Sequence, residues 1–167
     1  MSREYHLLSP LVAGEFGEES VFNEYPDGSG YDVVKVHFVF EDELEDCLFC
    51  NMTTYAGTKE LADRLREIKA TGIKFDEITV SKEGDFELPD IEWFRITGKA
   101  GKDDFGLHDG PPDKGIVVSS RVWDIIQELG VTYCLNFDYP PDKEAKWQNT
   151  EDLAKHYGII KPKKDNQ

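Results

Sequence analysis

The chain of 167 residues carries 34 Asp and Glu residues against 19 Lys and Arg residues, a formal net charge of −15. Such an acidic surface repels nucleic-acid phosphates and anionic membranes and attracts basic proteins, so neither nucleic acid nor a membrane is an expected partner. Hydrophobic residues make up 39% of the chain, which is enough to build a core and argues against wholesale disorder. A soluble acidic protein whose charge serves no particular partner is the simpler alternative.

The first residues, MSREYHLLSP, lack the apolar core and the small-residue cleavage pattern of an export signal. No apolar run approaches the ~20 residues that cross a membrane, so we expect a cytoplasmic protein. Cys47, Cys50 and Cys134 are then predicted to be free thiols. One C-x-x-C pair supplies too few ligands for structural zinc, and its acidic flanks disfavour a reactive thiolate. Buried or partly buried thiols are the favoured interpretation, with no metal and no cofactor.

The first half of the chain is predicted to be mostly extended. Residues 5–12 form a strand interrupted by Pro10, which indicates an edge or a bulge. Residues 13–30 are rich in turn residues. Residues 31–40, YDVVKVHFVF, alternate in character and are predicted to form a single strand with one buried face. That face comprises Val34, Val36, Phe38 and Phe40.

A helix is predicted over residues 58–71, with Thr58 as its N-cap and Gly72 as its stop. Residues 75–81 are predicted to form a strand. A further strand is predicted over residues 91–97. Its large residues point to both faces, which indicates a strand that is covered on both sides or lies at the centre of the sheet.

The clearest succession of elements closes the chain. A short strand over residues 115–118 precedes a helix over residues 119–129, which a Ser at its start and Gly130 at its end delimit. A last strand follows over residues 132–137.

Helices and strands do not alternate strictly, which favours an α+β fold. We predict a mixed, largely antiparallel sheet with two main helices and a short C-terminal helix. Residues 1–141 are predicted to form one domain, followed by a lysine-rich tail over residues 142–167 that holds the short helix near residues 150–157.

The negative charge is concentrated near the N-terminus. Residues 1–57 hold 12 acidic and 2 basic residues, a net charge of −10. The densest part is a run of acids that follows the strand at residues 31–40. It is either a solvated turn or a docking patch for a basic protein, because clustered acids accelerate and orient the approach of a cationic partner. The run comprises Glu41, Asp42, Glu43, Glu45 and Asp46.

No catalytic constellation stands out. The loop at residues 98–102, GKAGK, matches neither a P-loop nor a dinucleotide fingerprint, and Asp103 and Asp104 directly after it would repel a phosphate. A tight loop leaving a strand is the favoured interpretation. With 34 acids, a catalytic carboxylate pair is not excluded, but no pair is distinguished by its position.

The stretch over residues 90–140 resembles a family of small bacterial α+β proteins. The resemblance is carried by Trp93-x-x-Ile96-x-Gly98, by Asp103-Asp104-Phe105-x-Leu107, and by Ile116-Val117-Val118-Ser119 opening the helix RVWDIIQELG. That family was long catalogued as a domain of unknown function, and its members are predicted to be immunity proteins of polymorphic toxin systems.

The resemblance implies a protein without enzymatic activity that binds a cognate toxin domain and occludes its active or substrate-binding face. Many toxin domains are basic nucleases, so an acidic surface suits this role. Glu41, Asp42, Glu43, Glu45 and Asp46 are then the expected contact residues, with Asp103 and Asp104 as further candidates. Two alternatives remain open: a small hydrolase that uses carboxylates in a cleft, and a structural module stabilised by a metal bound to the cysteines.

Overall fold

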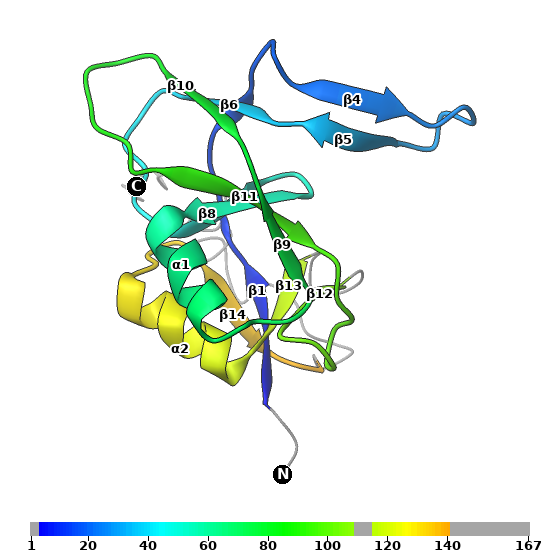
Figure 1. Ribbon diagram of the computed structural model, residues 1–167, viewed down its shortest axis with the longest axis vertical. Coiled ribbons are helices and arrows are strands. Elements are labelled where there is room, and N and C mark those ends of the chain that lie inside the picture. Colours follow the sequence, from blue (N-terminus) through cyan, green and yellow to red (C-terminus); the bar gives the residue numbers. More distant parts are fainter. Residues whose placement is uncertain (1–3, 109–114, 141–167) are drawn as a thin grey trace, which may run out of the picture.

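The computed structural model describes residues 4–108 and 115–140 and confirms the α+β class (Figure 1). Within these residues the strands form four sheets, whereas the sequence predicted one. The arrangement is mixed and largely antiparallel, as predicted, because only two of the pairings described are parallel. The predicted tail over residues 142–167, with its short helix, lies outside the described residues.

The lower part of the molecule in Figure 1 contains a four-stranded antiparallel sheet. β1 (Tyr5–Ser9) lies between β13 (Gly115–Ser119) and β14 (Leu135–Asp138), and β12 (Phe105–His108) pairs with the far edge of β13. β1 is therefore an interior strand, so the edge predicted for residues 5–12 is wrong for β1 and correct only for residues 11–12, which form an edge strand of another sheet. The chain leaves this sheet for another one at Pro10, where the missing N–H interrupts the hydrogen-bond ladder.

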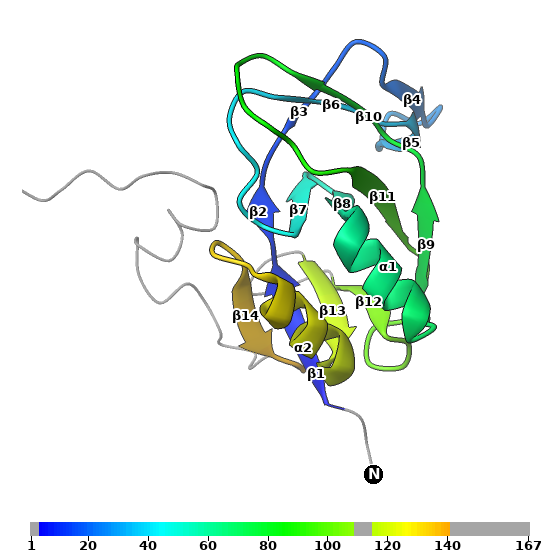
Figure 2. The ribbon, with the colours of Figure 1, turned by 60° about the vertical axis from the view of Figure 1, so that its left-hand side comes forward.

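A five-stranded sheet occupies the centre of the molecule (Figure 2). β7 (Leu48–Asn51), β8 (Thr54–Thr58) and β11 (Ile91–Ile96) form its antiparallel middle. β2 (Leu11–Val12) pairs with β7 in parallel at one edge, and β9 (Ile73–Asp76) pairs with β11 in antiparallel fashion at the other.

The central sheet is buried on both faces. In β11, Phe94 joins a core cluster with the lower sheet and the helices, and its neighbour Trp93 joins a second cluster with the strands above. Leu48 and Phe49 of β7 divide in the same way, because successive side chains of a strand point to opposite faces. The prediction that the strand over residues 91–97 is covered on both sides is confirmed.

The upper layer consists of a small sheet and a hairpin (Figure 1). β6 (His37–Phe40) lies between β10 (Thr79–Lys82) and β3 (Glu15–Phe16), parallel to the first and antiparallel to the second. β4 (Val21–Glu24) pairs only with β5 (Tyr31–Lys35) among the described strands, and together they extend away from the body.

The single strand predicted over residues 31–40 is wrong. It divides at Val36 into β5 and β6, which belong to different sheets. Val36 is buried and its carbonyl accepts a hydrogen bond from the Thr79 N–H at 3.0 Å, whereas Val34 on the hairpin is 58% exposed. The strand predicted over residues 75–81 divides similarly into β9 and β10. Alternation predicts an extended chain but does not reveal where it changes neighbours.

Helix α1 (Lys59–Glu67) begins as predicted. Thr58 is its N-cap, and the Thr58 hydroxyl accepts a hydrogen bond from the Leu61 N–H at 3.2 Å. The helix ends four residues before the predicted position, because Lys69 adopts a left-handed φ of 54° that the helix cannot continue through.

Helix α2 (Ser120–Leu129) packs beside α1 against the larger core cluster. Its predicted end at Gly130 is confirmed, with a φ of 110° that suits glycine. Ser119 stands at the N-cap position, but its hydroxyl does not cap the helix. It donates instead to the Asp104 carboxylate at 2.6 Å.

Candidate functional site: an acidic groove

The acidic run forms the connection between β6 in the upper layer and β7 in the central sheet. Leu44 turns inward against the upper core cluster and fixes the middle of this loop. Four carboxylates of the run are exposed, and they belong to Glu41, Asp42, Glu43 and Glu45.

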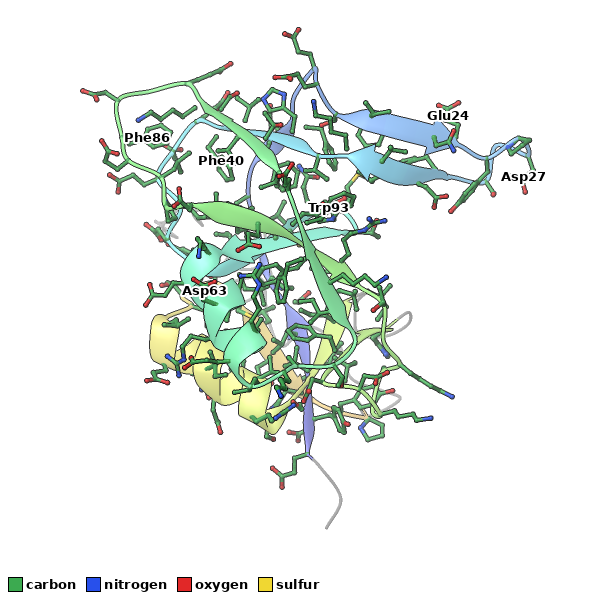
Figure 3. All side chains as sticks on the ribbon, in the orientation of Figure 1. Glu24, Asp27, Phe40, Asp63, Phe86 and Trp93 are labelled. Carbon is green, nitrogen blue, oxygen red and sulfur yellow. The ribbon has the colours of Figure 1, made fainter. Side chains whose placement is uncertain are left out.

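This loop is one wall of a groove with a volume of about 910 Å³. Among the described residues that line the groove, none is Lys, Arg or His. Figure 3 shows two of its apolar residues, Phe40 and Phe86, at the end of the upper layer opposite the hairpin. The exposed carboxylates that line the groove belong to Glu15, Glu41, Asp42, Glu43, Glu45 and Asp85. Leu11, Phe40, Leu44, Phe86 and Tyr133 supply its apolar and aromatic surface.

Tyr133 is a groove residue that the sequence did not single out. It was expected inside the last strand, but β14 begins at Leu135 and leaves Tyr133 in the preceding loop. The negative charge of Glu45 and a hydrogen bond with the Glu45 carboxylate raise the pKa of the Tyr133 phenol. The aromatic ring and the acidic loop therefore meet at one rim of the groove.

Asp46 lies behind this rim, 1% exposed. Its carboxylate accepts hydrogen bonds from the Thr132 N–H at 2.7 Å and the Tyr133 N–H at 2.9 Å. Burial raises the pKa of Asp46, and these two hydrogen bonds oppose that rise only in part. The predicted partner contact by Asp46 is wrong, because the side chain is buried and holds the Tyr133 loop in place.

Asp104 is also buried, with no exposed surface, so its predicted contact with a partner is wrong as well. Its carboxylate accepts hydrogen bonds from the Arg121 guanidinium at 3.0 and 2.6 Å, from the Ser119 hydroxyl at 2.6 Å and from the Thr71 N–H at 2.9 Å. Burial opposes ionisation of this group, but the hydrogen bonds outweigh burial and hold the pKa of Asp104 below its ordinary value. Asp104 therefore ties α2 to the segment that follows α1.

Asp103 is partly exposed and closes the loop that leaves β11. Its carboxylate accepts the Lys99 N–H at 2.7 Å, and its own N–H donates to the Lys99 carbonyl at 2.9 Å. The tight loop predicted for this segment is confirmed. The loop lies on the opposite side of the molecule from the connection between β6 and β7 (Figure 1), so Asp103 does not join the acidic groove.

A second groove, of about 970 Å³, lies below the hairpin and has a different electrostatic character. Lys35, Lys59 and Arg66 line it together with four acidic residues. Arg66 forms ion pairs with Asp63 and Glu92, so part of its charge is already compensated within the protein. This balance of signs gives no preference for a charged ligand, in contrast to the acidic groove.

The cysteines are free, and Cys47 and Cys50 are buried, as the sequence indicated. The Cys47 thiol donates to the Ile126 carbonyl and the Cys50 thiol to the Pro10 carbonyl, and both cysteines belong to the same core cluster, with Cys134 packed against it. Burial raises the pKa of Cys47 to about 12. Across residues 4–108 and 115–140, no group of three or more His, Cys, Asp and Glu side chains is arranged to hold a metal ion.

The fold and the groove define an α+β protein that presents one strongly acidic, partly apolar concavity. Comparison with known proteins finds no matching family model, no similar curated protein and no similar solved structure. The likeness to immunity proteins therefore stays a prediction. Neither helix in the described part of the chain is long and apolar enough to cross a membrane.

Proposed function

We propose that this protein is an immunity protein that binds a basic cognate toxin domain and occludes its active or substrate-binding face with an acidic surface. The observation that supports the proposal is the groove lined by six exposed carboxylates and by no cationic side chain of the described residues. Such a site favours a partner that brings Lys or Arg side chains into it.

Charge and apolar contact are combined in the groove, which suits protein binding. Exposed carboxylates accelerate and orient the approach of a basic surface, but rim charges alone add little affinity. The aromatic and aliphatic side chains of Leu44, Phe86 and Tyr133 are partly exposed beside these acids. An Arg of the partner could pair with Glu45 while its guanidinium stacks on the Tyr133 ring.

The alternative of a carboxylate-dependent hydrolase requires a desolvated carboxyl group that faces a substrate. Asp46 is the carboxyl nearest the groove whose pKa burial raises among the described residues. Both of its oxygens accept backbone N–H groups, so they are directed into the protein rather than into the groove. The groove geometry therefore favours binding over hydrolysis.

The first test is to co-express the chain with the C-terminal domain of the protein encoded by the adjacent gene and to measure their affinity at low and high salt. We expect a complex that weakens as salt rises, because exposed charges are screened. If no complex forms at low salt, the proposal is wrong.

The second test locates the contact. The double variant Glu41→Lys and Glu43→Lys reverses two groove charges, and we expect it to weaken binding by about tenfold or more at low salt. A matched control, Glu67→Lys with Asp124→Lys, makes the same change in net charge on exposed positions of α1 and α2. Equal losses in the two variants would indicate that only net charge matters and that the groove is not the contact.

A further inference from the structure

The hairpin of β4 and β5 presents an unusual amount of apolar surface for a two-stranded element. Phe22 and Tyr31 are each 38% exposed, and Val21, Tyr25 and Val34 are more exposed still. A two-stranded ribbon is marginal in water by itself, so large apolar side chains are not expected on it unless they are covered in function. Figure 1 shows the hairpin extending away from the sheets and helices.

The hairpin is nevertheless held in a defined position at its base. The Ser20 hydroxyl donates to the His37 carbonyl and accepts the His37 N–H, both at 2.9 Å. His37 is buried and its ring contacts the Glu19 N–H at 3.2 Å and the Ser81 hydroxyl at 2.8 Å. The base of the ribbon is therefore joined to β6 and β10.

A row of aromatic rings continues this support along the ribbon. Phe16 contacts the core residue Phe38 and also Phe22, with ring centroids 5.3 and 5.0 Å apart, and Phe22 contacts Tyr31 at 5.0 Å. The Tyr31 hydroxyl lies 3.7 Å from the Met52 sulfur. Half-exposed aromatic rings on a braced support lose little conformational entropy on binding, which is the property of an interface anchor.

The tip is ordered as well. The Tyr25 N–H donates to the Gly30 carbonyl at 2.8 Å, and the Tyr25 hydroxyl donates to Asp32 at 2.6 Å. Asp27 accepts the Ser29 N–H at 2.9 Å. Figure 3 shows Glu24 and Asp27 near the free end of the ribbon, away from the body.

The charge of the hairpin determines which kind of partner it fits. Residues 18–35 hold five acids and a single base, Lys35, which lies 3.5 Å from Glu19. A second copy of the chain would bring two such acidic ribbons together, which repulsion disfavours. A basic protein with an apolar cleft complements both the carboxylates and the aromatic rings.

We propose that this hairpin inserts into a cleft of a basic protein partner and supplies the apolar anchor of the complex, with Phe22 and Tyr31 as the main contacts. The inference rests on the proposed function, since the partner is the same toxin domain. It adds a surface separate from the acidic groove, because the two lie at opposite ends of the upper layer in Figure 3. The groove steers the partner and the hairpin holds it.

The test measures the affinity of the full chain for the C-terminal domain encoded by the adjacent gene. We expect the double variant Phe22→Ser with Tyr31→Ser to bind about 30-fold or more weakly, because aromatic anchors buried in protein interfaces contribute affinity of this size. Because these rings also brace the ribbon, a second variant replaces residues 21–34 by a short Gly-Ser turn and should lose binding to the same degree. Leu107→Ser, on the exposed side of β12 at 55% exposure, is the matched apolar control and should bind normally.

Three outcomes are decisive. Wild-type binding that both hairpin variants retain would overturn the hairpin inference and leave the proposed function standing. No binding by the wild type at low salt would remove the proposed function and the hairpin inference together. A wild-type dimer that becomes monomeric in the hairpin variants, with toxin-domain binding unchanged, would assign the ribbon to self-association and overturn the inference.

Discussion

Replacing Asp104 by Asn tests whether this residue is part of the scaffold rather than of a binding surface. The change keeps the shape of the side chain but removes its charge and places an NH₂ group where the carboxylate accepts hydrogen bonds. Whichever way the amide is turned, it meets at least one donor among Thr71, Ser119 and Arg121. We expect a folded but clearly less stable protein.

The size of the expected stability loss follows from how exposed the hydrogen-bonding partners of Asp104 are. The Arg121 side chain is 44% exposed, so solvent screening reduces its ion pair with Asp104 to about 1 kcal/mol. The donors of Ser119 and Thr71 meet a fully buried group, and a donor left facing another donor there costs about 1–3 kcal/mol. Together these two contributions lower the free energy of unfolding by about 3 kcal/mol, which corresponds to a fall of ~6–12 °C in Tm for a domain of this size.

Urea denaturation at pH 7 and at pH 3 measures both the size and the pH dependence of this effect. The folded-state pKa of Asp104 lies below its ordinary value of 3.8, so the carboxylate stabilises the fold fully above that value and progressively less as the pH falls below it. The difference in unfolding free energy between the wild type and Asp104→Asn should therefore be smaller at pH 3 than at pH 7. Asp103→Asn, at the partly exposed neighbour, should cost less than about 1 kcal/mol.

Two results would refute this reasoning about Asp104. One is a loss of stability below about 1 kcal/mol at pH 7, which would mean that the buried hydrogen bonds are easily replaced. The other is a difference in unfolding free energy that stays constant between pH 7 and pH 3, which would mean that the charge of Asp104 contributes nothing.

Two further predictions concern local stability and thiol chemistry. Thr58→Ala removes the acceptor of the Leu61 N–H and should destabilise the protein by about 1 kcal/mol in urea denaturation. Thr58→Ser keeps a hydroxyl acceptor and should be nearly neutral. Equal stability of the wild type and both variants would show that the cap is dispensable. Cys47 is buried and its pKa is raised to about 12, so it should react far more slowly with a disulfide reagent in the native protein than after unfolding in guanidinium. Mass spectrometry locates the labelled cysteine, and rapid labelling of Cys47 in the native protein would contradict its burial.

In the proposed complex, the groove and the hairpin should have different kinetic effects. Charge reversal in the groove should act mainly on the association rate and its salt dependence, because exposed carboxylates steer encounter. Loss of Phe22 and Tyr31 should act mainly on dissociation, because contacts between well-packed side chains determine how long a complex lasts. Stopped-flow association and dissociation measurements with the proposed toxin domain would separate the two contributions.

The sequence by itself determined the features that depend on neighbours along the chain. The α+β class, the cap at Thr58 and the helix end at Gly130 follow from spacing and from local backbone preference. The burial of both faces of β11 also follows, because Trp93 and Phe94 are adjacent and a strand directs adjacent side chains to opposite sides. The acidic loop could be predicted from the sequence because its acidic residues are nearly contiguous.

Only the tertiary structure decided what distant segments do to one another. Asp46 and Asp104 resemble the exposed acids beside them in sequence, yet each is buried because backbone N–H groups or a guanidinium from far along the chain supply its hydrogen bonds. Tyr133 enters the groove through the same long-range packing. The division of residues 31–40 at Val36 depends on Thr79, a pairing partner that alternation within the strand cannot specify.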